Sequence, residues 1–338
     1  MVPKFCRHNR LLQNCPICSR EQAVELRPLL SSSAPRVSEP RPRSSSSQAR
    51  RERTRDSMAR SGVTVRRVRT AADDGYRSAL APGLRSSEEA RRLAEEVAFA
   101  ATRLKLLASD PPGLYAEVAR TQPEVADRGN DLEERTWLAF LIAYLYPLEQ
   151  PDPFAGIAAV RTPWTSDPAQ LALDDVQMGP RSSHDPARGL QTVRAYRAWA
   201  DRAGSQAQAF IGDPGWSPDR RFARTFERLA LPGLHRAARY ELLLSLGALG
   251  VYELAAGTLA LGGNDEVTIA AKRALGIGDP LLLERRAAQL AEACKVPLGA
   301  LDLALYNWER EQRTTGGIGP DTPPGPAELD ATYAALEL

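Results

Sequence analysis

Metal-binding residue types gather at the beginning of the chain. Three of the four cysteines and one of the three histidines lie within the first eighteen residues. Thiolates and neutral imidazole are ligands that Zn²⁺ selects, and four of them complete a tetrahedral shell that leaves no position for water. The spacing therefore predicts a structural zinc knuckle over residues 1–20, with Cys6, His8, Cys15 and Cys18 as ligands. The alternative is a thioredoxin-like redox pair at Cys15 and Cys18, which would leave His8 without a role.

Asp265 is the carboxylate best suited to take part in a reaction. It precedes an apolar and basic run that ends at Gly276, a pattern that predicts a helix. At a helix N-terminus a carboxylate stays ionised, so it can accept a proton or stabilise a developing cation. The same position is typical of a plain N-cap, and the sequence does not separate the two roles. Lys272 and Arg273, further along this helix, are candidate phosphate ligands, with a solvated helix face as the alternative.

Two other stretches supply candidate DNA contacts. Residues 231–236 read LPGLHR, in which Gly233 allows a tight turn and Arg236 begins a helix whose free N–H groups can bind a phosphate. A Pro-Gly turn between helices is common, so this segment alone is not specific. Glu149 and Gln150 follow the apolar run 137–148 and are candidates for contact with an opened base stack, Glu149 as a second catalytic carboxylate. The alternative is a simple loop. Asp302, inside an apolar helix, predicts a buried ion pair with an arginine.

Three landmarks follow one another along the chain: the apolar run 137–148 with its loop, the LPGLHR turn and the segment that begins at Asp265. In this order they resemble the helix-hairpin-helix DNA glycosylases, and the resemblance covers residues 130–310. In that family an aspartate begins a helix that Leu-Gly ends eleven residues later, as Asp265 and Gly276 do here. Two positions depart from the pattern. The second glycine of the hairpin is His235, and the lysine nucleophile of the bifunctional glycosylases falls at Ala237. A Schiff-base lyase is therefore not expected.

The chain resembles one glycosylase-related family more closely, the bacterial clade of the α-glutamyl/putrescinyl thymine pyrophosphorylases. The similarity lies in residues 270–279 (AAKRALGIGD), 283–287 (LERRA) and 296–308 (VPLGALDLALYNW). It implies a transferase in which an amine displaces pyrophosphate from 5-(pyrophosphoryloxymethyl)uracil in DNA. Two alternatives stay open: a monofunctional DNA glycosylase, which needs only Asp265 and a water, and a non-enzymatic DNA-binding or adaptor protein.

The net charge of +2 hides an uneven distribution. Residues 34–70 hold eleven arginines against three acids, a charge of +8; the first 33 residues add +3, so the residues after Thr70 carry −9. A basic arm of this kind can bind the phosphate backbone, and a solvated linker is the alternative. The negative charge of the residues after Thr70 slightly favours a non-enzymatic adaptor over an enzyme that acts on DNA. Residues 21–86 lack apolar periodicity and are rich in Arg, Ser and Pro, which predicts a disordered linker.

The remaining chain predicts an all-α domain over residues 87–312. Ser86 and the acids after it predict the beginning of a helix, and apolar residues then recur at helical spacing. A Gly/Pro-rich tail with one short helix is expected at 313–338. Cys294 is expected to be a buried, inert thiol, and the scarcity of cysteine indicates a reducing, cytoplasmic location. Further helical patterns cover residues 130–147, 189–202, 218–229, 236–249, 266–274, 279–294 and 298–311.

Overall fold

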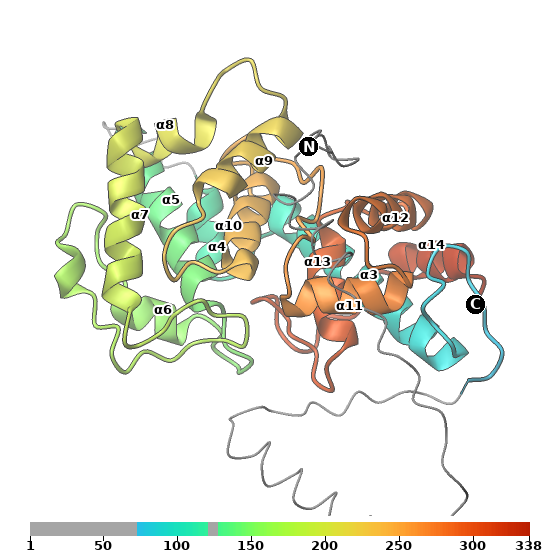
Figure 1. The fold of residues 1–338 in the computed structure, drawn as a ribbon. Helices are drawn as coiled ribbons and strands as arrows, with labels where there is room; N and C mark the ends of the chain where they lie inside the picture. Colours follow the sequence, from blue (N-terminus) through green and yellow to red (C-terminus); the bar gives the residue numbers. More distant parts are fainter. Residues whose placement is uncertain (1–72, 121–127) are drawn as a thin grey trace, which may run out of the picture. The chain divides into compact units, whose positions relative to one another are not determined.

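All regular structure described for the chain is helical. The computed structural model describes residues 73–120 and 128–338, and these contain twelve α-helices, one short 3-10 helix and no strand. The all-α prediction is therefore confirmed for this part of the chain (Figure 1). In chain order the elements are α3 (Ser87–Ser109), α4 (Leu114–Ala119), α5 (Arg128–Leu145), α6 (Ala155–Val160), η2 (Pro168–Gln170), α7 (Gly189–Ala203), α8 (Gln206–Ile211), α9 (Pro218–Arg228), α10 (Arg236–Ala248), α11 (Glu266–Leu275), α12 (Pro280–Ala293), α13 (Ala300–Trp308) and α14 (Pro326–Leu336).

Capping side chains fix several of the helix boundaries. The Ser86 hydroxyl accepts a hydrogen bond from the Glu89 N–H at 3.1 Å, so α3 begins where the sequence predicts. Asp279 caps α12 in the same way, through the Leu282 N–H at 3.0 Å. The helices that the sequence did not reveal are α4, α6 and α8. Each is six residues long, which is too short for a helical repeat to be recognised.

The described helices form two groups. In the first group α13 and α14 pack along α3, α11 packs on α13, and α12 contacts α11 and α14 (Figure 1). In the second group α5 contacts α4, α6, α8 and α10, while α7 packs on α8. Because α10 contacts both α3 and α5, it joins the two groups. The chain thus leaves the first group after α3, forms the second, and returns with α11.

An aromatic column forms the core of the second group. Trp137, Phe140 and Tyr144 follow one another on one side of α5 and are at most 1 % exposed. The ring of Phe140 stacks on Tyr196 of α7, with 3.8 Å between centroids. Trp199 continues the column beyond Tyr196. Aromatic pairs of this kind contribute to stability beyond the area they bury.

The predicted linker extends too far toward the helices. The sequence pattern places residues 73–86 in the linker, but Ala81 and Leu84 are buried in the core. The Gly83 N–H donates to the Ala274 carbonyl at 3.0 Å, and a Cβ at Gly83 would lie 1.7 Å from the Arg273 carbonyl oxygen. This segment therefore packs directly on the last turn of α11. Two buried apolar residues are too few to produce a periodic signal in the sequence. The rest of the predicted linker lies outside the described residues.

The C-terminal segment is part of the same core. Thr314 and Thr315 are buried, and the Thr314 N–H donates to the Asn307 side chain at 3.0 Å. The short helix expected in this segment is α14, which packs on α3. Cys294 is fully buried, and burial raises the pKa of its thiol to about 11, as an inert thiol requires.

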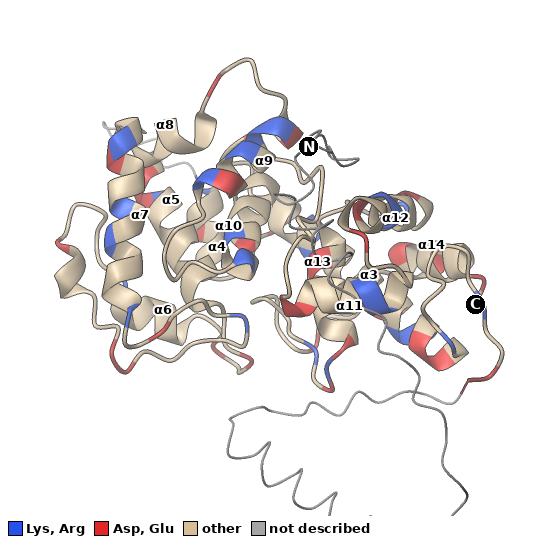
Figure 2. Cartoon of the chain, in the orientation of Figure 1, with Lys and Arg blue, Asp and Glu red and all other residues tan. Residues whose placement is uncertain are grey.

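Acidic and basic residues are interspersed along the described helices (Figure 2). Within residues 73–120 and 128–338, no helix combines the length and the apolar character that crossing a membrane requires.

Candidate functional site

The turn between α9 and α10 is held tightly against α7. Gly233 has a φ of +76°, and a Cβ there would lie 2.1 Å from the Thr192 hydroxyl oxygen. Ser183 fixes the turn from a second side, since its hydroxyl donates to the Gly233 carbonyl at 2.8 Å and accepts from the His235 N–H at 2.6 Å. The position therefore requires glycine for both conformation and space. Ser183 is a positioning residue that no sequence pattern indicated.

α10 begins immediately after this turn without a side-chain cap. His235 occupies the N-cap position, and its side chain makes no capping hydrogen bond. The first helical hydrogen bond runs from the Arg239 N–H to the His235 carbonyl at 3.1 Å. An uncapped helix N-terminus after a tight turn is the local geometry that a phosphate-binding hairpin needs.

Arg236, in the first turn of α10, is engaged by the protein itself. Its Nη1 lies 2.6 Å from Asp302 Oδ1, its Nε donates to the Ala260 carbonyl at 3.3 Å, and its Nη2 donates to the Leu259 carbonyl. The side chain is 9 % exposed, and the guanidinium lies over the ring of Tyr240. Every nitrogen of the guanidinium thus has a protein acceptor. The predicted phosphate contact of Arg236 would require it to exchange one of these partners.

Asp265 is brought to the same place by the N-terminus of α11. Its Oδ1 lies 3.8 Å from Arg236 Nη1, and its side chain is 29 % exposed. It also caps α11: Oδ1 accepts from the Thr268 N–H at 3.2 Å and Oδ2 from the Thr268 hydroxyl at 2.6 Å. The capping role is therefore confirmed. The contact with Arg236 places this carboxylate next to the helix that follows the Gly233 turn.

The two basic residues of α11 face different surroundings. Lys272 is partly exposed, and its Nζ lies 3.5 Å from the Gly263 carbonyl, which belongs to the loop that contains Asp265. Arg273 instead pairs with Glu89 of α3 and with Glu309 at 2.9 Å, and it lies over the ring of Trp308. Of the two, Lys272 is on the side of Asp265.

Glu149 and Gln150 lie in the loop that follows α5. The Glu149 carboxylate accepts from the Thr315 N–H at 3.0 Å, and burial around it raises its pKa although hydrogen bonds from residues 315 and 316 oppose the shift. Gln150 is exposed and donates to the Asp152 carbonyl at 3.3 Å. Within the described residues no direct contact joins either side chain to Asp265. Their predicted catalytic and base-probing roles stay predictions.

Two buried carboxylates, Asp302 and Glu241, form three ion pairs with arginines. Asp302 of α13 binds Arg181 at 2.5 Å as well as Arg236, so the ion pair predicted for Asp302 is confirmed, with two arginines instead of one. Arg103 of α3 pairs with Glu241 of α10 at 2.5 Å. Apart from Arg236, these side chains are at most 2 % exposed: Arg103, Arg181, Glu241 and Asp302. The pairs link α3, α10 and α13, and hence both groups of helices.

The backbone is strained at Tyr146, the residue that follows α5. Tyr146 has a φ of +60°, which is rare for a residue with a Cβ, and it is 1 % exposed. Its ring and that of Tyr306 lie against the guanidinium of Arg181, at 5.7 and 4.7 Å from the ring centroids. Among the described residues, the Tyr146 hydroxyl and the Nε and Nη1 of Arg181 have no hydrogen-bond partner. Strain and unpaired donors of this kind concentrate at functional sites.

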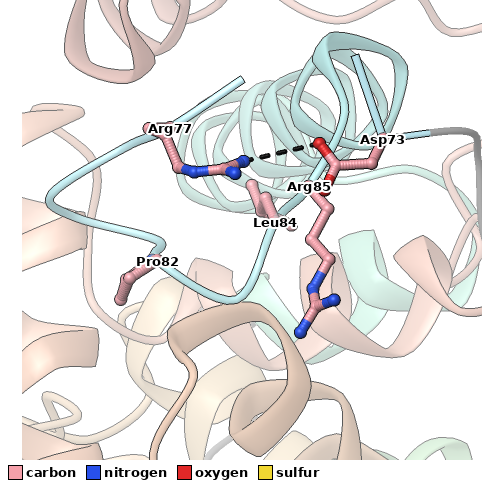
Figure 3. A pocket seen from close by; sticks show the side chains of 5 residues that line it. All are labelled: Asp73, Arg77, Pro82, Leu84 and Arg85. Carbon is pink, nitrogen blue, oxygen red and sulfur yellow. Dashed lines mark hydrogen bonds and ion pairs between the residues drawn. The ribbon is translucent and has the colours of Figure 1, made fainter. Parts of the chain in front are cut away.

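A cavity lies at the other end of α11. Asp73, Arg77, Pro82, Leu84 and Arg85 line a cavity of about 320 Å³, in which Asp73 and Arg77 pair at 3.5 Å and Arg85 extends away from them (Figure 3). An adjoining cavity is lined by Arg273 and Gly276, which belong to the last turn and C-cap of α11. Ten helical residues span about 15 Å, so these hollows are distant from Asp265.

The predicted zinc ligands and the arginine-rich arm lie outside the described residues. Within the described part of the chain, no group of three or more His, Cys, Asp or Glu side chains is arranged to hold a metal ion. Comparison with protein-family models, with curated proteins and with solved structures finds no match for this chain.

Proposed function

We propose that this protein modifies bases in DNA, as a transferase that uses a helix-hairpin-helix glycosylase-like arrangement. The observation that carries the proposal is the 3.8 Å contact between Asp265 and Arg236. It brings the N-terminus of α11, where the candidate carboxylate lies, next to the N-terminus of α10, where the Gly233 turn can hold a phosphate. A DNA strand bound at the turn would therefore pass close to Asp265.

In this proposal the target base leaves the duplex, because an enzyme cannot reach its atoms inside the stack. The substrate is a thymine whose 5-methylene carries pyrophosphate. The amine nitrogen forms a bond to that methylene carbon, the C–O bond breaks, and pyrophosphate leaves with the bonding electrons. Asp265 accepts the proton that the attacking nitrogen loses. Lys272, on the same side as Asp265, is the candidate contact for the leaving pyrophosphate.

The N-terminal residues have supporting roles in this scheme. A zinc ion held by Cys6, His8, Cys15 and Cys18 would order the first residues and take no part in the reaction, since four protein ligands leave no open position. The arginines of residues 34–70 would add sequence-independent affinity for DNA. A cytoplasmic location fits both the zinc thiolates and the buried Cys294 thiol.

The test is the product formed on DNA. The full-length protein is incubated with an oligonucleotide that contains 5-(pyrophosphoryloxymethyl)uracil and a supply of amines, and the nucleosides are analysed by mass spectrometry. The proposal expects release of pyrophosphate and a new amine-substituted thymidine with its glycosidic bond intact. An abasic site would show instead that the protein is a monofunctional glycosylase. DNA that is bound and left unchanged would identify a binding protein.

A further inference from the structure

A stripe of arginines runs along the exposed side of α9. Arg220, Arg224 and Arg228 are exposed and follow one another at four-residue spacing, which puts them on the same face of the helix. The opposite side of α9 is buried through Phe222 and Thr225. At 1.5 Å per residue the three arginines extend over about 12 Å. We call these three residues the α9 stripe.

An aromatic platform lies beside the α9 stripe. Trp216 is partly exposed, and the guanidiniums of Arg220 and Arg228 lie over its ring, at 6.0 and 5.1 Å from the ring centroid. The ring packs on Gly212, where a Cβ would lie 2.6 Å from it. Arg221, which is buried, fixes this loop by donating to the Trp216 carbonyl at 3.2 Å and the Ile211 carbonyl at 2.9 Å. The platform is therefore held in place before any ligand binds.

The stripe continues into a hollow between α7 and α9. A cavity of about 290 Å³ is lined by Arg202 and Arg228, with Trp199 and two alanines completing its wall. Arg202 is exposed, and Trp199 is 6 % exposed. An apolar floor with a guanidinium at two of its edges suits a flat, partly apolar group attached to an anionic chain.

Three acidic residues of this region point elsewhere or are weakly bound. Asp219 faces the loop at Gly257, where a Cβ would lie 3.1 Å from it, and Glu253 pairs with the buried Arg221. Glu227 pairs with Arg224 at 3.0 Å, but both side chains are more than half exposed, so the pair is easily replaced. Within the part of the chain that the structure describes, Arg202, Arg220 and Arg228 form no ion pair with a carboxylate.

We propose that the α9 stripe, Trp216 and the hollow at Arg202 form a binding surface for a single strand of nucleic acid. The guanidiniums contact phosphates, and a base stacks on the Trp216 ring in place of one of the guanidiniums that lie over it, a combination that binds single strands without sequence preference. The choice of DNA as the partner rests on the proposed function.

The experiment measures binding of the full-length protein to fluorescein-labelled oligothymidylate and to the corresponding duplex by fluorescence anisotropy over a range of salt concentrations. Arg224→Gln/Arg228→Gln removes two charges from the stripe. Arg91→Gln/Arg285→Gln is the matched control, since these exposed arginines lie on α3 and α12. Trp216→Ala and Trp216→Phe test stacking separately from charge.

The stripe variant should bind the single strand about tenfold more weakly, and its slope of log affinity against log salt should fall by about 1.4, because each lost single-strand phosphate contact contributes about 0.7. The control should bind like the wild type. Trp216→Ala should lose about tenfold with an unchanged slope, and Trp216→Phe should restore most of that loss. Equal losses for the stripe variant and the control, or equal losses on single strand and duplex, would overturn the assignment.

The result is separable from the proposed reaction. The loss of binding caused by the stripe substitutions should be the same in an Asp265→Asn background as in the wild type, because Asp265 lies outside this surface. Stripe-dependent binding by a protein without base-directed activity would refute the reaction alone. Full activity with no dependence on the stripe would refute this surface alone.

Discussion

Replacing Asp302 by asparagine should remove a large part of the stability of the helical body. The carboxylate is 1 % exposed and holds Arg181 at 2.5 Å and Arg236 at 2.6 Å. Asparagine keeps one acceptor but presents an NH₂ group to the second arginine, and it leaves two guanidiniums without a neutralising charge. Arg181 already has two nitrogens without a partner among the described residues. Breaking a buried pair in this way costs about 3–5 kcal/mol, against a typical total of about 5–15 kcal/mol.

The free energy of unfolding can be measured by urea titration of the wild type and of Asp302→Asn, followed by circular dichroism. Asp201→Asn, at an exposed position on α7, is the control and should lie within about 0.5 kcal/mol of the wild type. Asp302→Asn/Arg181→Met should recover part of the loss, because it removes one stranded cation. A cost below about 1 kcal/mol for Asp302→Asn would refute the claim that its ion pairs with Arg181 and Arg236 stabilise the fold.

The pH dependence of this difference has a definite sign. Burial alone would raise the pKa of Asp302, but the guanidiniums of Arg236 and Arg181 outweigh it and lower the pKa below its usual range. A lowered native pKa contributes stability above the unfolded-state value of about 3.9 and loses it as the pH falls through the native value. The difference in unfolding free energy between the wild type and Asp302→Asn should therefore be constant near neutral pH and decrease below about pH 4.

Three further predictions concern the turn and the N-terminal region. By the same urea titration, Gly233→Ala should cost about 3 kcal/mol of unfolding free energy, because a positive φ and the Thr192 hydroxyl both oppose a Cβ. Gly250→Ala, at φ +68° in open space, is the control and should cost about 1 kcal/mol. Similar costs for the two substitutions would contradict the packing argument. Freshly purified, reduced protein should contain one zinc by metal analysis, and Cys15→Ser should lose it while the helical content stays unchanged; protein without zinc would contradict the knuckle. Deleting residues 34–70 should weaken DNA binding uniformly across sequences and flatten its salt dependence, and an unchanged slope would make this segment a linker only.

Local signals in the sequence predicted local structure well. Ser86 marked the beginning of α3, because a hydroxyl followed by acids is a strong N-terminal signal whatever the rest of the fold does. Asp302 indicated an ion pair because an unpaired carboxylate in an apolar helix is too costly, yet the sequence did not name Arg181 or Arg236 as partners. The family resemblance selected Asp265, and the structure places it beside the start of α10.

The long-range part of the site was not accessible from the sequence. Arg103 and Glu241 are 138 residues apart and look like ordinary charged positions on two amphipathic helices. The strained backbone of Tyr146 leaves no trace in residue type, since neither glycine nor asparagine occupies the position. Ser183 fixes the Gly233 turn from a loop without any pattern. Such contacts depend on how the two groups of helices pack against each other, and local patterns in a single sequence do not show that packing.

The proposed action of Asp265 on a DNA base is tested most directly by comparing the same substitution at two helix caps. Asp265→Asn removes the anion but keeps a good N-cap, and Asp279→Asn makes the same change at the cap of α12, where the Leu282 N–H donates at 3.0 Å. Pyrophosphate release from DNA that contains 5-(pyrophosphoryloxymethyl)uracil is measured for both variants and for the wild type. We expect Asp265→Asn to lose at least about a hundredfold in turnover, the usual contribution of a positioned proton acceptor, while Asp279→Asn turns over like the wild type. Full turnover by a folded Asp265→Asn protein would contradict this expectation.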